Sequence, residues 1–97
     1  DVAERNPTRF ADLARAMGED VDSLPEGDRP FAFVTALEKL IAASGLAGET
    51  LSGYGVNESD IPALAANSLS AMGGIFACTP VKQDQADVER IFRRAFK

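Results

Sequence analysis

The 97-residue sequence predicts an all-α fold, a bundle of about four main helices. In four segments the apolar residues recur at the three- and four-residue spacing that places them on one face of a helix. Residues suited to capping precede these segments, and glycines follow the first two. No run alternates apolar and polar residues for more than about four positions, so a sheet is not expected. A chain of this length forms one domain at most, and we predict a single helical domain over residues 1–97.

The first two predicted helices cover about residues 7–17 and about residues 29–43. Asn6 is suited to cap the first helix, and Gly18 can take the left-handed conformation that ends it. Asp28 is suited to cap the second helix. The apolar stripes of the two helices consist of Phe10, Leu13, Ala14 and Met17, and of Phe33, Val34, Leu37, Leu40 and Ile41.

The other two predicted helices cover about residues 59–72 and about residues 85–95. Asn57 or Ser59 can cap the earlier helix, and Ser59 is preferred because Pro62 then lies in the first turn. Asp84 with Asp87 forms a capping-box pair at the start of the later helix. Their apolar stripes consist of Ile61, Leu64, Ala65, Leu69 and Met72, and of Val88, Ile91, Phe92, Ala95 and Phe96.

Residues 73–80 are predicted to form a loop that is too apolar to lie comfortably in water. We expect its apolar side chains to pack either on this domain's own helices or on another domain. The helix stripes are expected to share one core that includes Phe10, Phe33, Leu37, Leu64, Leu69, Ile91 and Phe92.

The composition excludes several classes of function. The net charge of -5 and the pI of about 4.6 argue against nucleic acid and anionic membranes as partners. The single Cys78 excludes an internal disulfide and fits a reducing, cytoplasmic compartment, where it is expected to act as a small packing residue. Because the chain has no His, we expect no catalytic residue, no metal ligand and no cofactor site within it.

Two alternatives remain open from the residues alone. Asp22-Ser23-Leu24 matches the triplet by which acidic helical acyl carrier proteins hold a phosphopantetheine arm, with Ser23 as the attachment site. The chain could also be an autonomous acidic helical interaction domain that uses the apolar loop at residues 73–80. A calcium loop starting at Asp20 is excluded, because its fifth and sixth positions are Leu24 and Pro25.

Four motifs follow one another in an order that is typical of one family. They are NPTRFADLARAMG at residues 6–18, LSGYGV at residues 51–56, DIPALA at residues 60–65, and Thr79-Pro80-Val81 followed by DQAD at residues 84–87. In this order and spacing the chain resembles the C-terminal part of the iron-dependent (group III) alcohol dehydrogenases over essentially all its length. The family's Asn-Pro-Arg is Thr79-Pro80-Val81 here, so its arginine contact is not expected, although Lys82 follows directly.

This resemblance implies a parent enzyme with an N-terminal Rossmann-like domain for NAD or NADP and a helical domain for a divalent metal, usually iron. In such enzymes the metal polarises the alcohol or aldehyde oxygen, so that hydride can pass between substrate and nicotinamide. The family's metal ligands, one Asp and three His, lie upstream of the matching part.

The resemblance therefore implies a C-terminal fragment of an NAD(P)-linked alcohol dehydrogenase, inactive by itself. Its partner would be the remainder of the dehydrogenase chain, and its exposed apolar surface would favour self-association. Ile75 and Phe76 match positions that border the family's substrate pocket and are expected to line it.

Overall fold

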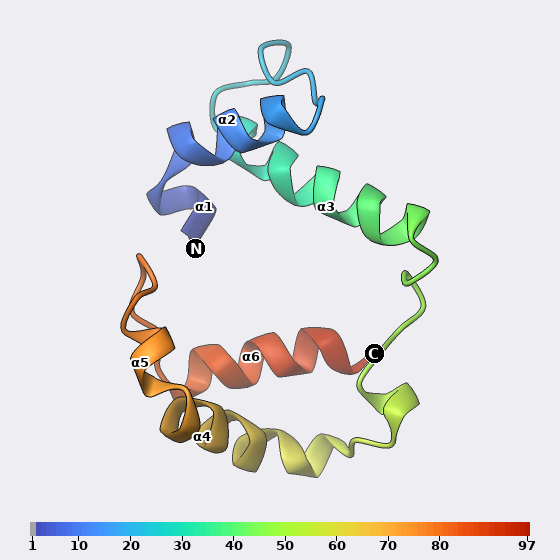
Figure 1. Cartoon of the computed structure of the whole chain (residues 1–97), viewed down its shortest axis with the longest axis vertical. Coiled ribbons are helices and arrows are strands. Elements are labelled where there is room, and N and C mark those ends of the chain that lie inside the picture. Colours follow the sequence, from blue (N-terminus) through green and yellow to red (C-terminus); the bar gives the residue numbers. More distant parts are fainter. Residues whose placement is uncertain (1) are drawn as a thin grey trace. The chain divides into compact units, whose positions relative to one another are not determined.

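The structure, a computed structural model, describes residues 2–97, and the regular elements among these residues are helices, with no strand (Figure 1). The predicted all-α class with four main helices is confirmed. The helices are α1 (Val2–Arg5), α2 (Pro7–Ala16), α3 (Ala32–Ala43), α4 (Ile61–Ala71), α5 (Gly73–Phe76) and α6 (Gln85–Phe96). Short 3-10 turns occur at η1 (Arg29–Phe31), η2 (Ser52–Tyr54) and η3 (Glu58–Asp60).

The chain divides into two compact units, unit 1 (Asp1–Gly48) and unit 2 (Glu49–Lys97). Each unit has its own buried residues. In unit 1 these are Ala3, Ala11, Ala14, Val21, Pro30, Ala32 and Ala36, and in unit 2 they are Ile61, Ala65 and Val88.

Unit 1 is organised around α2, which packs against η1 and against α3. Ala11 and Ala14 of α2 form a buried cluster with Val21 and with Ala32 of α3. Phe33 packs against this cluster, and its ring meets the Phe10 ring edge to face, with 5.4 Å between centroids. Because alanine side chains are short, the helix backbones can approach closely.

The start of α2 differs from the prediction, whereas its end agrees with it. The additional helix α1 precedes it, and the Asn6 side-chain amide donates a hydrogen bond to the Val2 carbonyl oxygen rather than capping α2. At the other end Gly18 has a φ of 91°, and the Glu19 N–H donates to the Ala14 carbonyl oxygen at 3.0 Å. Gly18 therefore ends the helix in the left-handed conformation that glycine allows.

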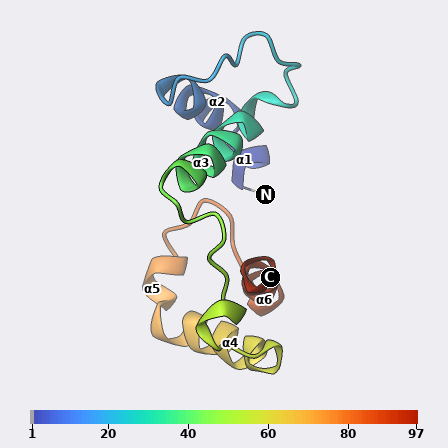
Figure 2. The same cartoon turned by 90° about the vertical axis from the view of Figure 1, so that its right-hand side faces the viewer.

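Unit 2 consists mainly of α4 and α6, which lie side by side (Figures 1 and 2). The capping box at the start of α6 is confirmed, because the Asp87 N–H donates to Asp84 Oδ1 at 2.9 Å and the Asp84 N–H donates to Asp87 Oδ2 at 3.1 Å. The predicted Ser59 cap is wrong. The helical segment begins at η3, directly after Asn57, which was the alternative cap. The Asn57 N–H donates to an Asp60 carboxylate oxygen.

The prediction of a shared core was wrong for Leu37 and Ile91, which are exposed. The other five residues named for that core, Phe10, Phe33, Leu64, Leu69 and Phe92, are only half-buried. Helical periodicity identifies an apolar face, but it does not reveal which part of that face a neighbouring element covers. Here the smaller residues on the same helices occupy the contacts.

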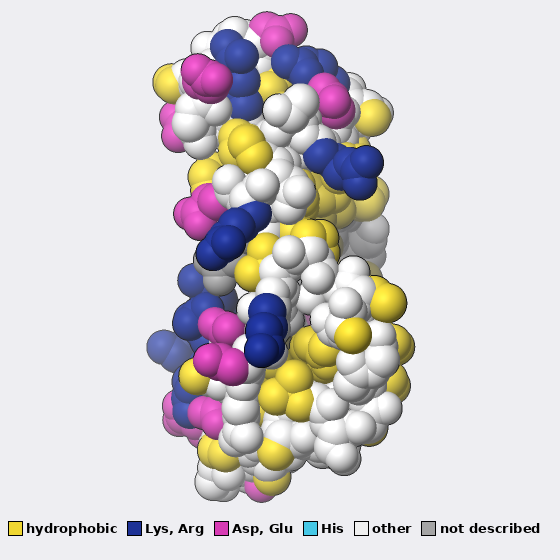
Figure 3. All heavy atoms as spheres, turned by 90° about the vertical axis from the view of Figure 1, so that its left-hand side faces the viewer, with side chains coloured by type: hydrophobic (Ala, Val, Ile, Leu, Met, Phe, Trp, Pro, Cys, Tyr) yellow, Lys and Arg dark blue, Asp and Glu magenta, His cyan; other side chains and the backbone are white. Residues whose placement is uncertain are grey.

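Large apolar side chains remain exposed in both units, and Figure 3 shows some of them between charged groups on one face. They are Leu13, Met17, Phe31, Val34, Leu37, Leu40, Ile41, Leu46, Tyr54, Met72, Ile75 and Ile91. Among residues 2–97 no helix is long and apolar enough to cross a membrane.

Candidate functional site

The apolar segment after α4 was predicted to be a loop, and that prediction was wrong for its first part. Gly73 to Phe76 form the helical turn α5, directly after α4. The Ile75 and Phe76 N–H groups both donate to the Met72 carbonyl oxygen, at 2.9 and 3.0 Å. The prediction failed because two glycines argued against a helix, while hydrogen bonds from the following residues stabilise this short turn.

Ile75 and Phe76 occupy different environments on this turn. The Ile75 side chain is exposed, with 66% of its surface accessible, whereas Phe76 is half-buried. The Ile75 side chain is therefore available for contact with another molecule or segment, whereas Phe76 is partly covered by unit 2. Their predicted role in lining a substrate pocket stays a prediction.

The side chains of Cys78 and Thr79 form hydrogen bonds at the end of the segment of residues 73–80. The Thr79 hydroxyl lies 2.8 Å from both the Phe76 and the Val81 carbonyl oxygens and can donate to either. Cys78 is exposed, contrary to the packing role predicted for it, and its thiol donates weakly to the Gly74 carbonyl oxygen at 3.4 Å. These bonds give the segment a defined path from α5 toward α6.

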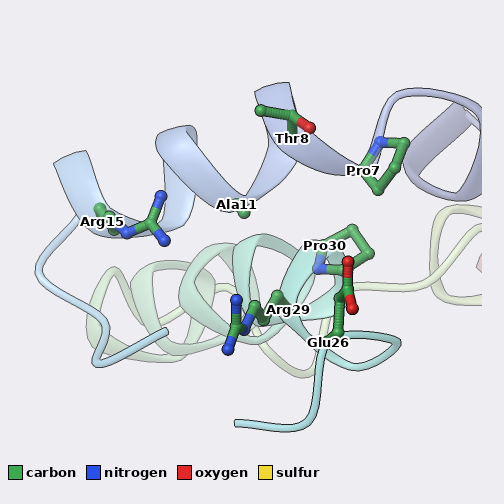
Figure 4. Close-up of a pocket in the computed structure, with 7 residues that line it drawn as sticks. All are labelled: Pro7, Thr8, Ala11, Arg15, Glu26, Arg29 and Pro30. Atoms are coloured by element: carbon green, nitrogen blue, oxygen red, sulfur yellow. The ribbon is translucent and has the colours of Figure 1, made fainter. Parts of the chain in front are cut away.

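A separate hollow of about 160 Å³ lies in unit 1, between α2 and the segment that leads into α3 (Figure 4). In the close-up the Arg15 and Arg29 guanidinium groups lie toward one end of the hollow, and Glu26 lies toward the other. Pro7, Thr8, Ala11 and Pro30 complete the lining. The hollow contains no nucleophile paired with a base, and the sequence interpretation did not identify it.

Both arginines at this hollow bond to groups outside its lining. Arg15 donates to Asp12 at 2.8 Å and to Asp22 at 2.7 Å, which ties the loop after α2 back to that helix. The hydrogen bond and charge of Arg15 lower the pKa of Asp22, and Asp22 in turn raises the pKa of Arg15. The Arg29 Nε donates to the Leu24 carbonyl oxygen. The pairing of Arg15 with Asp12 follows from their three-residue spacing on α2. Asp22 is seven residues from Arg15 in the sequence, and only the loop after α2 brings it close.

Three carboxylates with lowered pKa values predict that the fold loses stability in acid. They are Asp22 beside Arg15, Asp87 bonded by the Asp84 N–H and Arg90, and Glu89 bonded by Gln85 and Arg93. A group whose pKa is lower when folded stabilises the protein above its unfolded pKa, which is about 4. That stabilisation disappears as the pH falls through the folded pKa. We therefore expect a level thermal midpoint from about pH 7 to pH 5 and a decline below about pH 4.

Circular dichroism melts at several pH values would check this expectation. Asp87→Asn should flatten the decline, because it removes one of the three carboxylates whose pKa is lowered. The carboxylates are solvated, so added salt should weaken the effect. A midpoint that stays constant to pH 2 would contradict the prediction.

Comparison with known proteins accounts for the chain as a whole. Residues 2–96 match the family described as "Fe-containing alcohol dehydrogenase family, C-terminal". The chain belongs to the iron-containing alcohol dehydrogenase family. The resemblance drawn from the four sequence motifs is thereby confirmed, and the match lies in the C-terminal part of the family, as predicted.

Two relatives in the iron-containing alcohol dehydrogenase family are similar over 91 residues, which is 94% of this chain. The "1,3-propanediol dehydrogenase" of Citrobacter freundii is 36% identical, and the protein of the same name from Klebsiella pneumoniae is 34% identical. The chain spans only 23% of the length of either relative. No solved structure matches it significantly.

The residues of this chain do not fit an iron site by themselves. The chain has no His, and no group of three His, Cys, Asp or Glu side chains placed to hold a metal occurs in residues 2–97. Asp12 and Asp22 both form ion pairs with the same guanidinium group, that of Arg15. We therefore derive no reaction step through iron from this part of the protein.

The carrier-protein alternative does not agree with the position of Ser23. In such proteins the modified serine begins a helix, but here Ser23 lies in a turn, and its hydroxyl donates to the Asp20 carbonyl oxygen at 3.3 Å. Membership in the dehydrogenase family explains the same residues without a phosphopantetheine arm.

Proposed function

We propose that this chain is the C-terminal helical segment of a longer NAD(P)-linked, iron-dependent dehydrogenase that interconverts alcohols and aldehydes. The observation that carries the proposal is the family match over residues 2–96. The names of the two relatives make short diols such as 1,3-propanediol the first substrates to test. The parent is proposed to act in the cytoplasm.

In this proposal the chain contributes scaffold helices and one wall of the substrate pocket. Iron and the dinucleotide would be held by the remainder of the dehydrogenase, which is the proposed partner of this segment. Exposed Ile75 offers an apolar surface to the pocket, next to half-buried Phe76 in the sequence. By itself the segment is proposed to be inactive and to self-associate through its exposed apolar residues.

The proposal is tested with the full reading frame that encodes this chain. Upstream of Asp1 it should encode several His and a glycine-rich nucleotide loop. The full-length protein should reduce NAD⁺ or NADP⁺ with 1,3-propanediol, lose this activity on chelation and recover it with Fe²⁺. The 97-residue chain should show none of this activity. A full-length protein that oxidises no alcohol when loaded with iron would contradict the proposal.

Ile75→Ala in the full-length protein is expected to change substrate selectivity. Shortening an apolar side chain that lines a pocket enlarges the pocket and weakens contact with a short alcohol by about 1–3 kcal/mol. We expect KM for 1,3-propanediol to rise roughly tenfold, at the lower end of that range, while longer alcohols gain relative to it. The measurement is the ratio of kcat/KM for 1,3-propanediol to kcat/KM for a longer alcohol. Ile91→Ala, at a comparably exposed isoleucine on α6, is the control and should leave the ratio unchanged.

A further inference from the structure

Helix α3 has an apolar surface much wider than its contact with α2 requires. At 100° per residue, the apolar positions from Ala32 through Leu37 to Val34 span an arc of roughly 200° around the helix. Its polar residues, among them Thr35, Glu38 and Lys39, share the remaining side. A helix that packs on one side only has an apolar stripe of about 100°. The pattern on α3 is therefore that of a helix packed on two sides.

Only one edge of this arc is covered in unit 1. Ala32 and Ala36 are buried, and Phe33 is half-buried beside them. Farther around the helix Leu37, Ile41 and Val34 are exposed, with 47% of the Ile41 surface accessible. Leu40 lies beside Phe33 around the helix but about two turns closer to its C-terminal end, and it is 54% exposed. We define the α3 outer face as Val34, Leu37, Leu40 and Ile41.

The polar side of α3 is already partnered within unit 1. Lys39 Nζ donates to both carboxylate oxygens of Glu19, at 2.9 and 3.1 Å, and so links α3 to the loop after α2. No charged residue interrupts the α3 outer face. The centre of a permanent interface typically has few charged residues, whereas transient interfaces carry more polar groups.

We propose that the α3 outer face is the docking surface for an apolar segment of the same dehydrogenase polypeptide, outside these 97 residues. This inference rests on the proposed function. The match covers only 23% of the length of the two named relatives. A parent protein of similar length therefore has many residues outside the match from which the docked segment can come. In this arrangement α3 lies between α2 on one side and the docked segment on the other.

Cysteine labelling tests the proposal in the full-length protein. In a Cys78→Ser background, Leu40→Cys places a thiol on the α3 outer face, and Thr35→Cys places one on the polar side as a matched control. Other cysteines of the full-length protein are replaced as well. The rate of maleimide modification is measured in the full-length protein and in the 97-residue chain at a concentration at which it is monomeric. Leu40→Cys should react at least tenfold more slowly in the full-length protein, and Thr35→Cys at similar rates in both.

Three outcomes would overturn the proposal. Equal rates for Leu40→Cys in the two proteins would show that nothing covers the face. A slow rate already present in the monomeric 97-residue chain would show that the face is covered without the additional segment. Protection that disappears when a full-length oligomer is diluted to monomers would identify a second copy as the occupant.

Two controls keep the result interpretable. Ile41→Cys is a second probe of the same face, and circular dichroism confirms that each variant is folded. Alcohol oxidation by the unmodified full-length protein is assayed in parallel. If the protein oxidises alcohol but Leu40→Cys is not protected, the docking surface is overturned and the proposed function is not. If Leu40→Cys is protected but no alcohol is oxidised, the proposed function is overturned and the docking surface is not.

Discussion

Ile61→Ala is expected to lower the free energy of unfolding of the 97-residue chain by about 2–5 kcal/mol. The side chain is fully buried at the start of α4 and is the largest buried one in unit 2. The other two buried residues of that unit are Ala65 and Val88, which are smaller and cannot fill the cavity. Urea unfolding followed by circular dichroism at 222 nm measures the loss.

Ile91→Ala provides the matched control for this prediction. It makes the same chemical change in the same unit, but Ile91 is 52% exposed, so the expected loss is within about 0.5 kcal/mol. Equal losses for the two variants would mean that Ile61 is not the centre of the buried cluster of unit 2.

Ala14→Leu is expected to destabilise unit 1 by about 1–3 kcal/mol, for the opposite reason. Ala14 is fully inaccessible within the cluster that joins α2 to α3, so a leucine there must push the helices apart. Leucine has a helix propensity close to that of alanine, and the loss therefore reports packing rather than the intrinsic stability of α2.

Ala16→Leu is the control for this second prediction, because Ala16 is on the same helix and exposed. It should leave the urea midpoint nearly unchanged. If Ala14→Leu were tolerated equally well, the contact between α2 and α3 would have to be looser than the structure shows.

The sequence was most informative where a signal acts within a few residues. The Asp84 and Asp87 capping box and the left-handed Gly18 were both predicted, because each depends on hydrogen bonds or torsions inside one turn. The same local rules failed at Asn6, where the preceding helix α1 offered its side chain another acceptor. They also failed at the two glycines of α5, whose low propensity was outweighed by their neighbours.

Burial was harder to predict, because it depends on which elements meet. Leu37 and Ile91 have the spacing of core residues, yet both are exposed, while Ala32 and Ala36, which were in no predicted stripe, are buried. An amphipathic pattern shows which side chains favour burial, but it does not show whether another element packs over them. The exposed leucines and isoleucines of α3 show the difference most clearly, since their arc exceeds what α2 covers.

The functional assignment was predictable for a different reason. Motifs such as DIPALA at residues 60–65 identify the family through their order along the chain, which requires no knowledge of packing. The ion pair of Arg15 with Asp22 could not be found in this way, because the loop that joins the two residues has no regular spacing.

The alanines between α2 and α3 also affect how the protein reaches its final structure. Alanine has no side-chain torsion to restrict, so joining Ala11 and Ala14 to Ala32 loses no side-chain conformational entropy. Each leucine or isoleucine on the α3 outer face would instead lose about 0.5–1 kcal/mol when it is immobilised. The helix pair can therefore associate early while those side chains still rotate, and the entropic cost of ordering them falls on the later step that covers them.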